Sequence, residues 1–312
     1  GMDNAANRHP NYYGVDILDA RETQVGLPIF FGGNFISGNL SDGVVVRGLA
    51  RDTRVQVNYI GVDFTRTAAV TNGSSGIYVD AFDTVIGGPD GFNQIAGNNL
   101  NGISINGGSG TVVQGNYVGL DSSGNAGISN KQYGISINNA TNVLIGGAGG
   151  LRNVIASSRL TGLVVGGSSS NVVVQGNYIG LNASGDAAIR NGTNGLGVDA
   201  SDVTIGGTGV LGNVISGNSS FGIEINTGRN ARVLGNTIGL AADGVTPIPN
   251  ASGGVRIRAG AVGVFFGGTN SAEANVVARN GSTTEFIVDG PSAGHQILGN
   301  FIGVQRFGAT FT

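Results

Sequence analysis

The chain has 312 residues, a formal net charge of −3 and no cysteine, so disulfides and cysteine-ligated metals are excluded. Charged residues make up only 11% of the chain and form no basic run, which argues against electrostatic binding of nucleic acid. No apolar run reaches the length of a membrane span, so we expect no membrane insertion. The 59 glycines among 40% hydrophobic residues indicate many short strands joined by tight turns.

Three strand-like pieces follow one another in chain order and then recur. The first is a Gly-apolar-x-apolar piece, such as 134–137, which we call strand A. The second is an apolar piece, such as 171–174 or 203–205, called strand B. The third, called strand C, is the YIG or VIS piece, and its YIG form ends the GNYIG string at 176–180, which recurs at 115–119, 235–239 and 299–303. The alternation in these pieces is short and has period two, which is typical of strands.

The glycine that begins strand A sets the length of one coil. Successive copies are separated by alternating steps of roughly 26 and 33 residues, so one coil is about 30 residues long. The glycines are Gly14, Gly43, Gly76, Gly102, Gly134, Gly162, Gly195, Gly222 and Gly254, and a blurred tenth copy lies near Glu285. Equivalent strands of neighbouring coils must then pair in parallel, and parallel crossovers are right-handed almost without exception.

The predicted fold is therefore all-β: a right-handed single-stranded parallel β-helix of about ten coils with three strands per coil. We expect residues 1–312 to form one such domain, with coils from about 14 to 305. The N-terminus carries no signal peptide, and the sequence stops in mid-pattern at Thr312, so we expect an excerpt of a longer protein.

Two columns of asparagine accompany the strands. One asparagine precedes strand C in every coil, and a second column lies four residues before the strand A glycine, with Ser158 in one coil. Asparagine tolerates tight bends and both donates and accepts hydrogen bonds, so both columns predict structural ladders. The first column contains Asn34, Asn58, Asn93, Asn116, Asn153, Asn177, Asn213, Asn236, Asn275 and Asn300; the second contains Asn39, Asn72, Asn98, Asn130, Asn191, Asn218 and Asn250.

The alternation of NVISGN (213–218), GIxI and GNYIG motifs resembles the parallel β-helix repeats of secreted and surface proteins of bacteria, over about 14–303. The resemblance implies an adhesin-like or scaffold role and an extracellular or cell-surface location. The wider fold is shared by polysaccharide lyases, hydrolases, epimerases and phage tailspikes. Acid clusters like those of polygalacturonase-like hydrolases are absent. The sequence Tyr13-Gly14-Val15-Asp16 matches an alginate-epimerase-like motif without its histidine.

Three tyrosines, Tyr59, Tyr117 and Tyr178, are predicted to point outward from strand C on alternate coils. Alternate coils lie about 9–10 Å apart, close to the repeat of an extended disaccharide, and aromatic faces are good apolar platforms. One interpretation is therefore a glycan-binding stripe. The other is that the tyrosines pack beneath loops.

Strand B presents an apolar outward stripe on successive coils. Exposed apolar stripes usually mark interfaces, so the stripe predicts self-association or, alternatively, filler beneath insertions. Its members are Val85, Val112, Leu144 and Val173, followed by Thr204.

The densest charge cluster lies on strand A, where Glu224 and Arg256 occupy successive coils near Asp199, with Arg190 and Arg258 around them. A carboxylate beside an arginine could bind a uronic acid or, acting as a base, support lyase chemistry. The alternative is ordinary surface ion pairs. His295 is interpreted as a solitary strand B histidine rather than a catalyst.

Acidic pairs mark two turns between strands A and B: Asp80 with Asp83, and Asp199 with Asp202. Each pair could bind a calcium ion with backbone carbonyls, or cap its turn. No other cofactor is expected.

The leading hypothesis is a non-catalytic β-helical module of a secreted or cell-surface protein, serving as a stalk or binding a polysaccharide, a surface glycan or a protein partner. The second is a polysaccharide-active enzyme (lyase, hydrolase or epimerase) with its site on strand A. The third is a phage tailspike-like trimer built through the strand B stripe.

Overall fold

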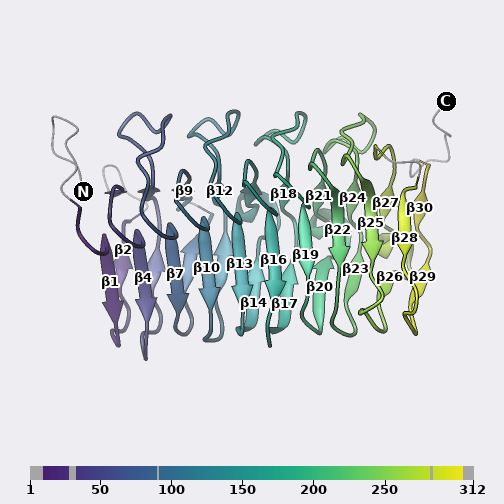
Figure 1. The fold of residues 1–312 in the computed structure, drawn as a ribbon, viewed down its shortest axis with the longest axis horizontal. Coiled ribbons are helices and arrows are strands. Elements are labelled where there is room, and N and C mark those ends of the chain that lie inside the picture. The colour runs from purple at the N-terminus through teal and green to yellow at the C-terminus, as the bar shows by residue number, and fades with distance from the viewer. Residues whose placement is uncertain (1–9, 28–32, 90, 282–283, 305–312) are drawn as a thin grey trace.

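The computed structural model describes residues 10–27, 33–89, 91–281 and 284–304. Its strands form a parallel β-solenoid with three ten-stranded sheets, and β1 and β28 lie at opposite ends of the rod (Figure 1). The predicted all-β solenoid with three strands per coil is confirmed. Among the described segments, no helix is long and apolar enough to cross a membrane.

Each sheet collects one strand from every coil, in chain order. Sheet A contains β1 (Val15–Leu18), β4 (Val44–Arg47), β7 (Ile77–Asp80), β10 (Ile103–Asn106), β13 (Ile135–Asn138), β16 (Leu163–Gly166), β19 (Leu196–Val198), β22 (Phe221–Ile225), β25 (Gly253–Ile257) and β28 (Phe286–Val288). Sheet B contains β2 (Gln24–Val25), β5 (Arg54–Val55), β8 (Val85–Gly87), β11 (Val112–Gln114), β14 (Thr141–Ile145), β17 (Ser170–Val174), β20 (Val203–Gly206), β23 (Arg232–Leu234), β26 (Phe265–Gly267) and β29 (Gln296–Leu298). Sheet C contains β3 (Phe35–Ile36), β6 (Tyr59–Ile60), β9 (Gln94–Ile95), β12 (Tyr117–Val118), β15 (Val154–Ile155), β18 (Tyr178–Ile179), β21 (Val214–Ile215), β24 (Thr237–Ile238), β27 (Val276–Val277) and β30 (Phe301–Ile302). Single 3₁₀ turns lie between sheets B and C at η1 (Gly149–Leu151), η2 (Gly209–Leu211) and η3 (Ser271–Glu273).

The core is a stack of identical inward positions. Ile103 pairs with Ile135 and Ile105 with Ile137, and all four side chains are fully buried. The period-two alternation of each strand A explains this, because every second side chain points inward. A coil therefore buries its apolar surface only against its neighbours.

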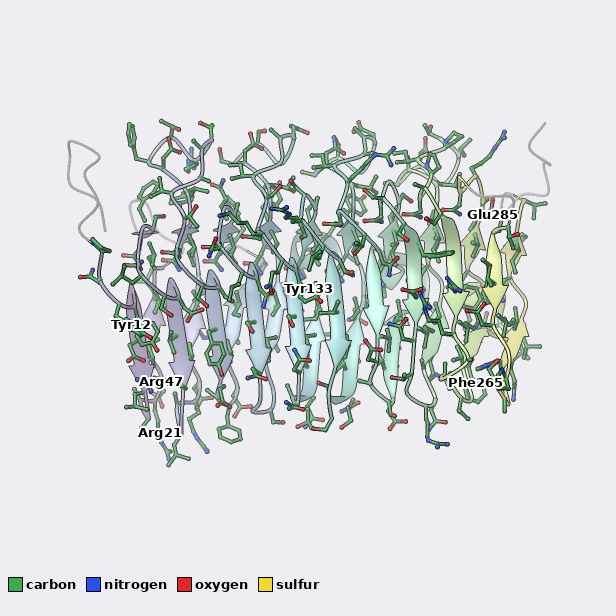
Figure 2. All side chains as sticks on the ribbon, in the orientation of Figure 1. Tyr12, Arg21, Arg47, Tyr133, Phe265 and Glu285 are labelled. Atoms are coloured by element: carbon green, nitrogen blue, oxygen red, sulfur yellow. The ribbon has the colours of Figure 1, made fainter. Side chains whose placement is uncertain are left out.

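Both predicted asparagine ladders are present. In the ladder before sheet C, Asn93 Nδ2 donates to Asn116 Oδ1 over 2.9 Å, and Asn116 Nδ2 donates to Asn153 Oδ1 over 3.0 Å. The second ladder runs from Asn39 to Asn72 and onward, and it extends further than predicted, to Asn280. Glu285 accepts from Asn280 there, at the C-terminal end of the rod (Figure 2).

Four long loops follow sheet C on alternate coils, at 63–68, 121–126, 182–187 and 241–246, and they project along one edge of the rod (Figure 1). The loops contact one another: Ala183 N–H donates to Gly124 O over 2.9 Å. Gly124 has φ +70°, and a Cβ there would meet the Ala183 methyl and the Tyr117 ring. Glycine is required at this point because any side chain would push the loop away from sheet C.

Candidate functional site

Charged side chains do gather on sheet A around Glu224, but the arginine that pairs with Glu224 is not the predicted one. Arg256 is the register neighbour of Glu224, yet Glu224 Oε1 accepts from Arg258 Nε and Nη2, both at 2.7 Å. Its second oxygen, Oε2, accepts from Asn194 Nδ2 over 2.7 Å. The residue is only 7% exposed. Both carboxylate oxygens of Glu224 are therefore occupied by protein donors, and the residue forms a buried ion pair with Arg258.

The other candidates of this cluster are not joined to Glu224. Arg256 Nε donates to Asp289 Oδ2 over 2.8 Å, and both side chains are partly exposed. Asp199 follows β19 on the preceding coil and is exposed; its backbone carbonyl accepts the Thr227 hydroxyl. Arg190 is also exposed. The geometry thus divides the predicted cluster into two separate ion pairs and an isolated carboxylate.

The acidic turn residues are exposed and lie on two coils, at the turn from sheet A to sheet B. Asp83 and Asp202 both adopt positive φ, and Asp202 Oδ1 accepts from Asn230. Asp80 and Asp199 occur four strands apart in sheet A, at β7 and after β19, as predicted. Within the described ranges, no group of three or more His, Asp or Glu side chains is arranged to hold a metal ion. Calcium binding stays a prediction.

The strand B stripe is in register as predicted. Val112 pairs with both Val85 and Leu144, and Leu144 pairs with Val173, with all four side chains partly exposed. Self-association through it stays a prediction. His295 lies just before β29, where its Nδ1 accepts the Val264 N–H over 3.1 Å and burial lowers its pKa.

One of the three predicted tyrosines, Tyr178, is buried, and Tyr59 is partly exposed. Tyr178 is 8% exposed, with the guanidinium carbon of Arg152 3.9 Å from its ring centre and the loop 182–187 against its ring through Gly185. Tyr59 packs against Phe35, with ring centres 4.7 Å apart, and its hydroxyl accepts from Arg66. Tyr178 therefore follows the alternative interpretation, in which tyrosines pack beneath loops, whereas Tyr59 packs beside Phe35 and stays partly exposed.

Tyr117 has a different environment. It lines an open cavity of about 360 Å³ on sheet C, between η1 and the loop 121–126. We call this space the Tyr117 cavity; its walls are Phe92, Tyr117, Ser122, Arg152, Val154, Ala183 and the backbones of Gly115, Gly149 and Gly150. The rings of Phe92 and Tyr117 are partly exposed, with centres 5.4 Å apart. The cavity thus combines two aromatic rings, a hydroxyl and a guanidinium.

The sequence alone did not reveal Phe92 and Arg152. A signal was present, because each occupies the position just before a ladder asparagine, Asn93 and Asn153. Six of the ten coils have glycine at that position. At this position in the turn between sheets B and C, the side chains of Phe92 and Arg152 extend over sheet C, where they contact Tyr117 and Tyr178.

The loop that carries Ser122 is fixed by Asp121. Partial burial would raise the pKa of Asp121, but hydrogen bonds from the Ser123 hydroxyl and from the Ala126 and Asn125 amides outweigh it and lower that pKa. Ser123 Oγ donates to both carboxylate oxygens, at 2.9 and 2.8 Å. One wall of the Tyr117 cavity is therefore a preorganised turn.

Comparison with known proteins shows similarity of fold. No family model and no curated protein matches the sequence. The structure is similar to the Dettilon tailspike protein, with a TM-score of 0.63 and 17% identity over 93% of this chain and 54% of that one. It is similar to tailspike protein 2 of an Escherichia coli O157:H7 bacteriophage, with a TM-score of 0.52 and 14% identity over 91% and 35% of the two chains.

A double mutant of the periplasmic alginate epimerase AlgG is similar as well, with a TM-score of 0.50 and 18% identity over 83% of this chain and 62% of that one. The chain thus spans about half the length of the Dettilon tailspike and less than two thirds of the epimerase. At these identities the similarity establishes the β-helix fold, and function has to be argued from the site.

Proposed function

We propose that the chain is a non-catalytic, glycan-binding β-helical module that acts outside the cell or at its surface, and that the Tyr117 cavity is its binding site. The observation that carries this proposal is the pair of partly exposed rings, Phe92 and Tyr117, in an open cavity with the Ser122 hydroxyl and Arg152. Sugar rings have apolar faces that pack on aromatic rings and hydroxyl edges that need hydrogen-bonding partners.

The lining of the cavity favours binding over cleavage. Among the described residues that form its walls there is no carboxylate and no imidazole. Glycoside hydrolysis uses a pair of carboxylates, and proton abstraction needs a base within hydrogen-bond reach. The same fold occurs in a phage tailspike and in a periplasmic alginate epimerase, and the alginate epimerase supports a glycan as the ligand.

The test is titration calorimetry of the chain with a panel of neutral and acidic oligosaccharides. We expect Tyr117→Ala to weaken binding by about tenfold, since a lost aromatic contact costs roughly 1 kcal/mol or more. The matched control is Tyr59→Ala, which removes the equivalent ring two coils away, outside the Tyr117 cavity, where it contacts Phe35 and Arg66. Equal losses in the two variants would contradict the proposed site.

A polysaccharide-active enzyme with its site on sheet A is the second candidate, and the buried carboxylate of Glu224 is the observation that favours it. New reducing ends or unsaturated-uronide absorbance after incubation with a polysaccharide panel, lost in Glu224→Gln, would support this candidate. Full activity in that variant, or activity lost only in Tyr117→Ala, would reject the sheet A site.

A tailspike-like trimer is the third candidate, favoured by the partly exposed stripe of Val85, Val112, Leu144 and Val173 on sheet B. Light scattering decides it. A trimer that dissociates in Leu144→Lys would support assembly through sheet B, whereas a monomeric chain would reject it.

A further inference from the structure

Arg152 is the one charged side chain among the described walls of the Tyr117 cavity. Two contacts fix it. Its Nε donates to Gly176 O over 3.2 Å, and its guanidinium carbon lies 3.9 Å from the centre of the Tyr178 ring. The guanidinium is thereby held against the ring of the buried Tyr178 without any ligand.

The described residues leave the charge of this guanidinium unpaired. The ion pairs found among them join other arginines, namely Arg47, Arg256 and Arg258, to carboxylates. Asp121 lies next to the cavity residue Ser122, but its oxygens are occupied by Ser123 and by backbone amides. Nη1 and Nη2 of Arg152 make no hydrogen bond to a described residue, which leaves donors for a ligand.

A fixed, planar guanidinium is well suited to a planar carboxylate, which it can bind through two parallel hydrogen bonds. Because the side chain is already held by Tyr178 and Gly176, little rotamer entropy remains to be lost when the ligand binds. The aromatic rings of Phe92 and Tyr117 line the same cavity and can support the ring of the sugar that carries the carboxylate.

We infer that the Tyr117 cavity selects a uronic-acid sugar, with its carboxylate on Arg152 and its ring on Tyr117. This inference rests on the proposed glycan binding and specifies that the bound glycan is acidic. It concerns sheet C, whereas the sequence had suggested uronate recognition at Glu224 and Arg256 on sheet A.

The experiment compares each acidic oligosaccharide with its own methyl ester, which keeps the sugar and removes the charge. Oligomers of galacturonate, mannuronate and guluronate are titrated by calorimetry against the full chain. For at least one sugar we expect the acid to bind about tenfold or more tightly than the ester, because hydrogen bonds to charged groups are the strong ones. Arg152→Gln should remove this preference, because it weakens binding of the acid much more than binding of the ester.

An unaltered far-UV circular dichroism spectrum and melting transition show that the variant is folded. Arg152→Lys should keep part of the preference, since it keeps the charge without the planar fork. Arg66→Gln is the matched control, because Arg66 lies over the Tyr59 ring at 5.0 Å in the same way but does not line the cavity, and it should keep the full preference.

Equal affinity of acid and ester in the unaltered chain would overturn this inference and leave glycan binding at Tyr117 intact. If a sulfated oligosaccharide bound tightly and no uronate oligomer bound, the inference would also be overturned, because the recognised anion would be a sulfate and not a carboxylate. Absence of binding to every acidic and neutral sugar would overturn the proposed function itself.

Discussion

Arg152 stacks on Tyr178, with its guanidinium carbon 3.9 Å from the ring centre, and this contact joins the turn before β15 to the next strand of sheet C. Tyr178 is itself buried, so it acts on any ligand only through the arginine that it supports. The contact links the packing of sheet C to the preorganisation of the Tyr117 cavity.

Tyr178→Leu tests that link. The leucine keeps apolar volume but removes the ring face, and a cation–π contact of this kind contributes about 1–2 kcal/mol. We expect weaker binding of an acidic oligosaccharide by a fewfold to tenfold, measured by calorimetry, with little change for its methyl ester. Tyr59→Leu is the control. Equal weakening of acid and ester would show that Tyr178 does not orient Arg152.

Asn116→Ala tests the ladder before sheet C. The Asn116 amide accepts from Asn93 and donates to Ile86 O and Asn153, all within the buried interior. Several buried polar groups would lose partners, so we expect the free energy of unfolding to fall by about 2–4 kcal/mol in chemical denaturation. Asn226→Ala, at a partly exposed position, should change it by less than about 0.5 kcal/mol. Similar losses in both variants would remove the special role of the ladder.

Glu224→Gln tests the ion pair on sheet A. The change weakens the contact with Arg258 at a position that is 7% exposed, and we expect a loss of about 1–2 kcal/mol of unfolding free energy. Asp16→Asn breaks the exposed pair with Arg47 and should cost less than about 1 kcal/mol. Glycan binding at the Tyr117 cavity should be unaffected in both, and a loss of binding in Glu224→Gln would move the site to sheet A.

Asp121 makes stability depend on acid pH. Its folded-state pKa is lowered, because the hydrogen bonds from Ser123 and the amides outweigh the effect of burial. A carboxylate with a lowered pKa stabilises the fold at pH above its unfolded pKa of about 4, and this contribution is lost as pH falls through the folded value. We expect the melting temperature to fall between about pH 5 and 3, and to fall less steeply in Asp121→Asn. Parallel curves for the two proteins would contradict this role.

Core substitutions should cost more in the middle of the rod than at its end. Ile137 on β13 is fully buried, whereas Ile302 on β30 is 39% exposed. We expect Ile137→Ala to cost about 2–5 kcal/mol and Ile302→Ala about 1 kcal/mol or less, by chemical denaturation. Comparable costs would indicate that the last coil is as tightly packed as the centre.

The repeat in the sequence predicted the fold well, because each position is copied in every coil and small local signals add up. The glycines before strand A and the asparagines before strand C defined the register, and the structure pairs Ile103 with Ile135 as that register requires. The limits appear where a residue departs from the repeat. The blurred tenth copy near Glu285 concealed Asn280, which continues the second ladder and donates to Glu285.

The site was harder to predict, because it depends on contacts between different columns. Tyr59, Tyr117 and Tyr178 are equivalent by sequence period, and the packing of Phe35, Phe92 and Arg152 makes them different. On sheet A, the partner of Glu224 proved to be the diagonal Arg258 rather than the adjacent Arg256. The length and direction of a side chain decide which partner it reaches, and the periodicity of a strand gives no information on either.

The asparagine ladders have a direction. Wherever two described ladder asparagines are bonded through their side chains, Nδ2 of one coil donates to Oδ1 of the following coil, as from Asn93 to Asn116 and from Asn218 to Asn250. The side-chain amide dipoles therefore point the same way along the axis and add, as peptide dipoles do in an α-helix. Each run of bonded asparagines is in this sense electrically polarised, with its positive end toward the C-terminal coil.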